Sequence, residues 1–146
     1  MEFDIKKVSD ENELKICLEI RRTVFIEEKN VPAEIENDEY DCLDGRSEHF
    51  LVFADKKPVG TVRMLFTDSD CVKLQRLCFL KEYRGFGLGS RTVEYLEERY
   101  RSLGKKKIFM EAKFAVSPFY EKCGYKAVSD IFYEVGIKHI KMEKEI

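Results

Sequence analysis

A glycine-dense turn between an expected strand and an expected helix constrains this chain more than any other stretch. Val72–Phe79 largely alternates apolar and polar residues, as a half-buried strand does, and from Ser90 onward apolar residues recur with helical period. Between them, Arg84–Arg91 contains the sequence RGFGLGSR. Glycines let the backbone approach a ligand closely, and the first N–H groups of a helix have no internal partner. The stretch therefore predicts an anion site, and its two arginines favour a phosphate or pyrophosphate.

Two common phosphate-binding motifs do not fit this turn. A Walker loop ends in Gly-Lys-Ser/Thr, and no lysine follows Gly89. A dinucleotide fingerprint could place its first glycines at Gly85 and Gly87, but Ser90 stands where its third glycine or alanine belongs. What remains is Arg84-x-x-Gly87-x-Gly89 after a strand. Taken alone, that motif leaves a tight turn without any ligand as an alternative.

A second block downstream makes the pattern specific. Lys107–Ala112 (KIFMEA) is expected to form a strand, and Ser117–Tyr125 contains SPFYEKCGY. Together the two blocks resemble the GNAT N-acetyltransferase superfamily, which carries Arg/Gln-x-x-Gly-x-Gly/Ala and then Phe-Tyr-Glu-Lys-x-Gly-Phe/Tyr. The resemblance spans nearly the whole chain. It implies an α+β fold in which helices flank a mixed, mostly antiparallel central sheet.

The amino-terminal part of the chain narrows the resemblance to one branch. Arg21–Glu28 (RRTVFIEE), the Val31-Pro32 pair and the spaced acids that follow are similar to the ElaA-like and YjcF-like members. Those members carry Arg-x-x-Val-Phe-Val-x-Glu-Gln and then a proline-containing acidic stretch. Lys29 stands where the branch usually has glutamine, so the role of that glutamine does not transfer to this chain.

The order of expected elements is β-α-β-β-β-α-β-α-β-β. Asp10, with Glu13 three residues later, is expected to cap the first helix, and Gly104 to end the second. The apolar face of the second helix is expected to include Leu103. The expected strands are Phe3–Val8, Phe50–Ala54, Val59–Phe66, Val72–Phe79 and Lys107–Ala112, with closing strands at Tyr125–Val128, Ile131–Val135 and Ile137–Met142.

Length and charge exclude several classes of protein. A chain of 146 residues suits one domain, 1–146. With 26 Lys and Arg against 28 Asp and Glu, the formal charge is −2, and no basic field indicates nucleic-acid binding. The first ten residues contain no apolar signal, and no stretch reaches the length of a membrane span. We expect a cytoplasmic monomer or homodimer that binds neither nucleic acid nor membrane.

The five cysteines are scattered and do not form a metal-binding pattern. We therefore expect reduced thiols and no metal cofactor. Cys17 and Cys78 fall within apolar patterns, which predicts two small core residues rather than nucleophiles.

The resemblance implies acetyl-CoA as co-substrate. The pyrophosphate would lie on the turn, and the pantetheine arm would lie along the strand before it, where Leu77 and Phe79 present backbone groups. A backbone N–H there could also stabilise the oxyanion that forms when an amine attacks the thioester. The implied cofactor-binding residues are Leu77, Cys78, Phe79, Arg84, Gly85, Phe86, Gly87, Leu88, Gly89 and Ser90.

Tyr120 occupies the position of the family's general acid in the second block. A phenol with an ordinary pKa near 10 is protonated at neutral pH and can protonate a departing thiolate. Without the resemblance, a buried tyrosine that packs the short helix would be the better interpretation.

The general base is less defined by the sequence. Three carboxylates are within reach of the expected cleft: Glu27, Glu28 and Glu111. His139 lies in Gly136-Ile137-Lys138-His139, which resembles a Gly-Ile-Pro-His stretch of the branch. We name Glu28, Glu111 and His139 as base candidates, and a satisfied or exposed histidine remains the alternative for His139.

The acid-rich segment Ala33–Glu48 allows two interpretations, a solvated loop or a collar that attracts a cationic amine. We favour the solvated loop. Arg21 lies on the apolar stripe of the first helix, and we expect it to be ion-paired or at the margin of that stripe rather than to bind a ligand.

Two functions from different classes remain open at this stage. The first is an acetyl-CoA-dependent N-acetyltransferase that acts on a primary amine of a small molecule or peptide. The second is a non-catalytic acyl-CoA-binding or sensor module.

Overall fold

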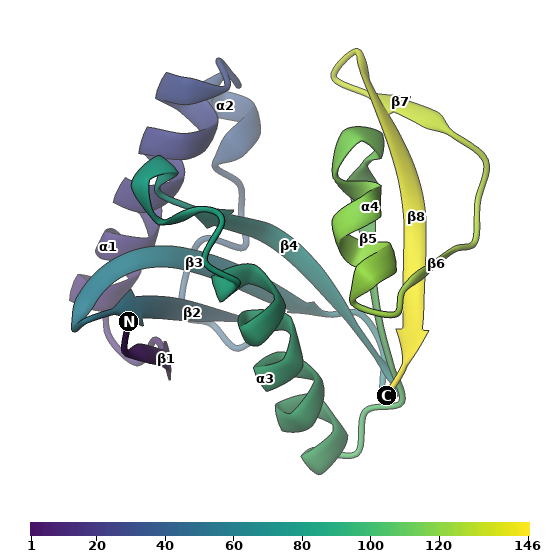
Figure 1. Ribbon diagram of the computed structural model, residues 1–146, viewed down its shortest axis with the longest axis horizontal. Helices are drawn as coiled ribbons and strands as arrows, with labels where there is room; N and C mark the ends of the chain where they lie inside the picture. Colours follow the sequence, from purple (N-terminus) through teal and green to yellow (C-terminus); the bar gives the residue numbers. More distant parts are fainter. The chain divides into compact units, whose positions relative to one another are not determined.

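The structure is a computed structural model that describes residues 1–146 (Figure 1). Its strands lie where apolar and polar residues alternate in the sequence. The strand order is β1-β2-β3-β4-β5-β8-β6, with β7 on β8. β4 and β5 are parallel, and β1–β2, β2–β3, β5–β8, β6–β8 and β7–β8 are antiparallel, which confirms a mixed, mostly antiparallel sheet. The strands are β1 (Phe3–Lys7), β2 (Ser47–Ala54), β3 (Lys57–Phe66), β4 (Cys71–Phe79), β5 (Lys107–Lys113), β6 (Lys126–Ala127), β7 (Phe132–Glu134) and β8 (Ile137–Glu145).

The helices begin and end at the expected signals. The Asp10 carboxylate accepts a hydrogen bond from the backbone N–H of Glu13 at 2.8 Å, and Gly104 follows the second long helix with φ +84°. The helical segments are α1 (Glu11–Arg21), which continues as a π-helical segment (Arg22–Glu28), α2 (Ala33–Glu36), a 3₁₀ turn (Lys81–Tyr83), α3 (Leu88–Ser102), a 3₁₀ turn (Phe114–Val116) and α4 (Ser117–Lys122).

Two details differ from the expected order. The short helix α2 lies inside the acidic segment, where no helical periodicity is present to predict it. All three expected closing segments contain a strand, one more than the two that end the expected order, and β6 and β7 each pair separately with β8.

The contacts of the chain divide it into two compact units. The first unit comprises Met1–Leu65 and Arg76–Thr92, and the second comprises Phe66–Gln75 and Val93–Ile146. β4 and α3 therefore each contribute residues to both units. One domain over 1–146 stays a prediction.

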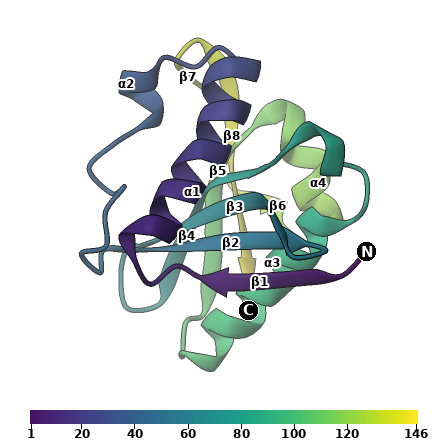
Figure 2. The same ribbon diagram turned by 90° about the vertical axis from the view of Figure 1, so that its left-hand side faces the viewer.

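In the first unit, α1 packs against β2 and builds an apolar core (Figure 2). Leu14, Cys17 and Ile20 of the helix meet Leu51 of the strand and Cys78 of β4, and all are buried. Burial raises the pKa of the Cys17 thiol to about 11 and that of Cys78 to about 12. Both cysteines are inert core residues, as expected.

In the second unit, alternate residues of β5 enter the core. Ile108, Met110 and Ala112 are buried, together with Met142 of β8, and α4 lies against β8 (Figure 1). Leu103 was expected on the buried face of α3, but it is 58% exposed because the helix ends one residue before it. None of the helices combines the length and the apolar composition that a membrane span requires.

Candidate functional site

The glycine turn of the first unit has the backbone that an anion site requires. Gly85 and Gly87 have φ of +87° and +78°, a conformation that L side chains rarely adopt. A Cβ added at either position would meet nothing within 4 Å, so the glycines serve the backbone conformation and the space beside the turn is open. The Gly87 carbonyl accepts from the Arg91 N–H at 3.2 Å and from Ser90 Oγ at 3.1 Å. The preceding N–H groups at the start of the 15-residue α3 remain available to a ligand.

Arg84 holds this turn rather than standing free beside it. Its two terminal nitrogens each lie 2.7 Å from a carboxylate oxygen of Glu28, and its Nε donates to the Phe79 carbonyl at 2.9 Å. The guanidinium therefore connects the turn to the π-helical segment and to the end of β4. At the other end, the Arg91 guanidinium lies 4.2 Å from the Phe3 ring centroid.

The same ion pair decides what Glu28 can do. The hydrogen bond from Arg84 lowers the pKa of Glu28 to about 2, although partial desolvation opposes it. A carboxylate with so low a pKa is a weak proton acceptor at neutral pH. Of the three base candidates, Glu28 is the one whose contacts fit the role least.

The end of β4 that precedes the turn is interrupted. Arg76 has φ +57°, which breaks the regular strand, and β4 pairs with β5 only over Cys71–Lys73. Beyond the interruption, Cys78 is buried while Leu77 and Phe79 are half-buried. The Phe79 ring lies directly on Gly60 of β3, where an added Cβ would come within 2.4 Å of it.

Three acids of the acidic segment in the first unit, Glu36, Asp38 and Asp41, pair with arginines of the protein. Arg21 and Arg63 are each 1% exposed. Arg21 donates to Glu36 at 2.9 Å, and Arg63 donates to Asp38 at 2.6 Å and to Asp41 at 2.9 Å. Asp41 also accepts from Arg21 at 2.5 Å. Most of the segment is exposed, as expected of a solvated loop, but Glu36 and Asp41 are not, and the expectation of an ion-paired Arg21 is confirmed.

This buried network also extends to the interruption in β4. The Arg76 guanidinium donates to the Glu36 carbonyl at 3.1 Å and lies 3.4 Å from Asp38. Three arginines thus meet three carboxylates, and each carboxylate has a cationic partner within the protein. These three acids are already neutralised, so they do not contribute to a collar that would attract a cationic substrate.

Tyr120 lies in α4 of the second unit with only 6% of its surface exposed. Its ring packs edge-to-face on Phe119 and Tyr125, with centroids 5.0 and 6.0 Å away, and no protein group hydrogen-bonds its hydroxyl. Burial raises the pKa of Tyr120 above its ordinary range. The pKa of Tyr120 is therefore higher than the expected ordinary value near 10. The phenol is protonated at neutral pH, as expected.

The two remaining base candidates come together on one face of the second unit's strands. Glu111 on β5 lies 2.7 Å from Lys73 Nζ, and His139 on β8 is 8% exposed. Glu134 on β7 joins them, with its carboxylate 3.8 Å from His139 Nε2. Sequence reasoning missed Glu134. Pairing the expected strands Ile131–Val135 and Ile137–Met142 as a hairpin would have found it, because that pairing places Glu134 opposite Ile137, two residues before His139.

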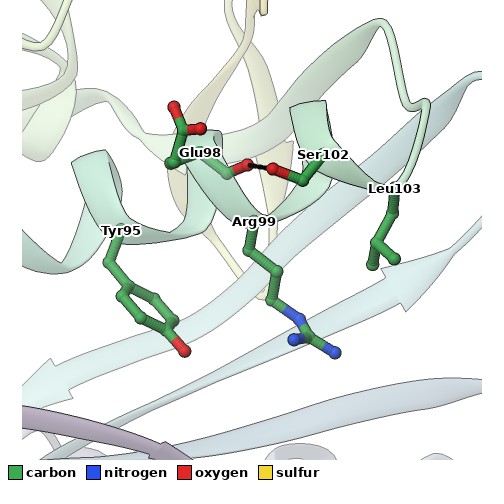
Figure 3. A pocket seen from close by; sticks show the side chains of 5 residues that line it. All are labelled: Tyr95, Glu98, Arg99, Ser102 and Leu103. Atoms are coloured by element: carbon green, nitrogen blue, oxygen red, sulfur yellow. Dashed lines mark hydrogen bonds between the residues drawn. The ribbon is translucent and has the colours of Figure 1, made fainter.

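A separate pocket of about 300 Å³ lies on one side of α3, lined by Tyr95, Glu98, Arg99, Ser102 and Leu103 (Figure 3). Ser102 Oγ donates to the Glu98 carbonyl at 2.9 Å within the helix. None of the expected site residues lines this pocket. No group of three or more His, Cys, Asp or Glu side chains is arranged to hold a metal ion.

Known proteins resemble this chain in sequence and in fold along nearly its whole length. A family model described as an acetyltransferase (GNAT) domain matches residues 7–146. The uncharacterized N-acetyltransferase YjcF of Bacillus subtilis (strain 168) is 38% identical over 137 residues, which cover 93% of this chain and 95% of YjcF. The crystal structure of Escherichia coli ElaA has a TM-score of 0.83 at 26% identity and covers 99% of each chain. A crystal structure of aminoglycoside 6′-N-acetyltransferase complexed with coenzyme A has a TM-score of 0.79 at 17% identity, covering 97% of this chain and 96% of that one.

Proposed function

Because this chain belongs to the GNAT acetyltransferase family, we propose that it transfers the acetyl group of acetyl-CoA to a primary amine of a small molecule or peptide. The amine attacks the thioester directly in a ternary complex, without a covalent enzyme intermediate. The observation that carries this proposal is the glycine turn, where two residues with positive φ lie beside open space at the start of α3. The relatives YjcF and ElaA belong to the branch that the sequence resembles.

The residues of the turn fit the pyrophosphate of coenzyme A. Backbone N–H groups of Gly85–Ser90 would bind the phosphate oxygens, and the helix dipole of α3 adds to their attraction. Arg84 acts here mainly through Glu28, by holding the turn in shape. Acetyl-CoA supplies the activated acetyl group. Leu77, Cys78 and Phe79 would present backbone groups to the pantetheine arm, and one N–H among them would stabilise negative charge on the thioester oxygen.

Tyr120 is the proposed general acid. A buried phenol stays protonated across the neutral range, and its hydroxyl has no acceptor within the protein. It can therefore donate its proton to the leaving thiolate sulfur.

His139 is the proposed general base. Glu28 is bound by Arg84 and Glu111 by Lys73, and both hydrogen bonds lower the pKa of the carboxylate. His139 is the remaining candidate, and an imidazole nitrogen is a suitable proton acceptor near neutral pH.

We also propose that the protein works in the cytoplasm as a monomer or homodimer and that its partner is an amine rather than a nucleic acid. All five cysteines are unpaired, as is usual for proteins of reducing compartments. The formal charge of −2 supports the absence of a nucleic-acid partner.

A thiol-release assay with acetyl-CoA tests the function against a panel of amines, polyamines, amino acids and peptides. We expect turnover with one class of amine, and we expect Tyr120→Phe to lower kcat about a hundredfold with little change in calorimetric acetyl-CoA affinity. Tyr95→Phe on α3 is the matched control. Binding without turnover for any amine would favour the non-catalytic acyl-CoA module, and full activity in Tyr120→Phe would refute the assignment of the acid.

A further inference from the structure

One face of the second unit's strands collects polar side chains that the proposed chemistry uses only in part. Antiparallel pairing places Glu111 opposite Lys141 and Lys113 opposite His139, and parallel pairing places Lys73 opposite Phe109. Because directly paired residues share a face and side chains alternate along a strand, these residues all lie on the face opposite Met110 and Met142. The hairpin of β7 and β8 adds Phe132 and Glu134 to the same face.

His139 is held on this face with one nitrogen uncommitted. Its Nδ1 lies 2.8 Å from the Ile137 carbonyl oxygen, so Nδ1 carries the hydrogen and donates it. Nε2 then presents a lone pair, which no hydrogen bond in the protein uses. The Phe132 ring stacks on the imidazole at 5.9 Å with an interplanar angle of 27°. The hydrogen bond to Ile137 and the stacking on Phe132 hold the imidazole, which is 8% exposed, in one orientation.

Glu134 lies in front of that lone pair. Its Oε2 is 3.8 Å from Nε2, which is too long for a hydrogen bond between the two groups. A ligand nitrogen that lies about 2.8 Å from both Glu134 Oε2 and His139 Nε2 can donate one hydrogen bond to each of these two atoms. Such a donor needs at least two hydrogens on one nitrogen, as a primary ammonium has.

The charge of Glu134 depends on its neighbours. Partial desolvation and the nearby Glu111 carboxylate raise the pKa of Glu134. Glu111 itself is held by Lys73, which donates to it at 2.7 Å and lowers its pKa. A cation that arrives beside Glu134 lowers the pKa of Glu134, because it stabilises the carboxylate.

We propose that Glu134 and His139 form the subsite that receives the acceptor amine, in which the Glu134 carboxylate binds the primary ammonium and His139 Nε2 takes one of its protons. The N–H bond of the ammonium breaks and an N–H bond forms at Nε2. The products are a neutral amine with its lone pair and an imidazolium next to a carboxylate. This inference rests on the proposed function for the use of that lone pair, but ammonium binding itself can be measured without acetyl-CoA.

Nuclear magnetic resonance of the histidine side chains tests the subsite directly, since the chain contains only two histidines. His49 is the internal reference, because its Nε2 is held by the Tyr40 carbonyl and Ser47 in the first unit. His139→Gln assigns the signals. We expect n-propylammonium chloride to shift the His139 signals and tetramethylammonium chloride, which has no N–H, to leave them unchanged. We expect Glu134→Gln to abolish the shift and Glu134→Asp to retain part of it.

The pH dependence of this binding provides a second readout. The charged and titratable groups that share the face by strand pairing are Cys71, Lys73, Lys107, Glu111, Lys113, Lys126, Glu134, His139, Lys141, Glu143 and Glu145. Since the pKa of Glu134 is raised, we expect the propylammonium shift to be lost as the pH falls through a value above the ordinary 4.5. No such loss should occur in Glu134→Gln, where binding is absent throughout.

Kinetics separate this subsite from the transferase proposal. With an amine that supports turnover, Glu134→Gln should raise KM for the amine about tenfold to a hundredfold, the range for a lost charged hydrogen bond, while Glu145→Gln near the end of β8 should not. A shift of His139 by propylammonium without turnover for any amine would refute the transferase and keep the subsite. Turnover with no propylammonium shift, or with unchanged KM in Glu134→Gln, would overturn the subsite alone.

Discussion

Asp41→Asn tests the buried charge network of the first unit. Asp41 is the carboxylate that both fully buried arginines share, because it accepts from Arg21 and from Arg63. Burial works to raise the pKa of Asp41, but the hydrogen bond from Arg21 and further favourable contacts outweigh it and lower the pKa to about 2. The difference between the ordinary pKa of 3.8 and the folded value of about 2 corresponds to about 2 kcal/mol of favourable interaction.

The substitution should cost more than this interaction alone. Asparagine keeps the shape of the side chain but leaves two buried guanidinium groups short of one negative charge, and unpaired buried charge typically costs about 3–5 kcal/mol. We therefore expect the free energy of unfolding at pH 7 to fall by about 3 kcal/mol. Urea unfolding followed by circular dichroism measures it, since the chain contains no tryptophan.

Asp44→Asn is the matched control in the same segment. Asp44 pairs with Arg46 at 2.7 Å, but both side chains are more than 40% exposed. An exposed pair of this kind contributes less than about 1 kcal/mol. Equal losses in Asp41→Asn and Asp44→Asn would refute the reasoning, because burial would then not decide the cost.

The sign of the pH dependence follows from the same shift. A carboxylate whose pKa is lowered on folding contributes its stability above the unfolded pKa and loses it as the pH falls through the folded value. The contribution of Asp41 should therefore disappear between about pH 4 and about pH 2 in the wild type. The same interval should show a smaller loss in Asp41→Asn than in the wild type.

Two further predictions concern backbone conformation. Gly87→Ala should weaken coenzyme A binding about fivefold to thirtyfold in calorimetry, because an alanine at φ +78° costs about 1–2 kcal/mol; unchanged affinity would show that this conformation does not matter for the ligand. Val135→Asn should stabilise the protein by about 1 kcal/mol in urea unfolding, since Val135 and Gly136 form the two-residue β7–β8 turn with φ of +51° and +73°, where Asn-Gly is preferred. A lower urea midpoint in Val135→Asn would contradict strain at Val135.

Local pattern was enough to predict most of the fold. The alternation of Lys107–Ala112 and the helical period after Ser90 depend on neighbours within a few residues, and those neighbours are visible in the sequence. The short strands β6 and β7 lie within two expected closing strands, but a local pattern does not say which strand pairs with which, so their separate pairing with β8 escaped prediction. α2 has only four residues, too few to establish a period, and also escaped prediction.

Residue types at short, constant spacing were enough to predict the glycine turn, the strand before it and the family resemblance. Which charges meet depends instead on the folded chain. Arg63 and Asp38 are 25 residues apart, and Lys73 and Glu111 are 38 apart, so their pairing depends on how distant strands are brought together. That folding turned an acidic segment into the counter-charge of buried arginines, and it placed Glu134 in front of His139.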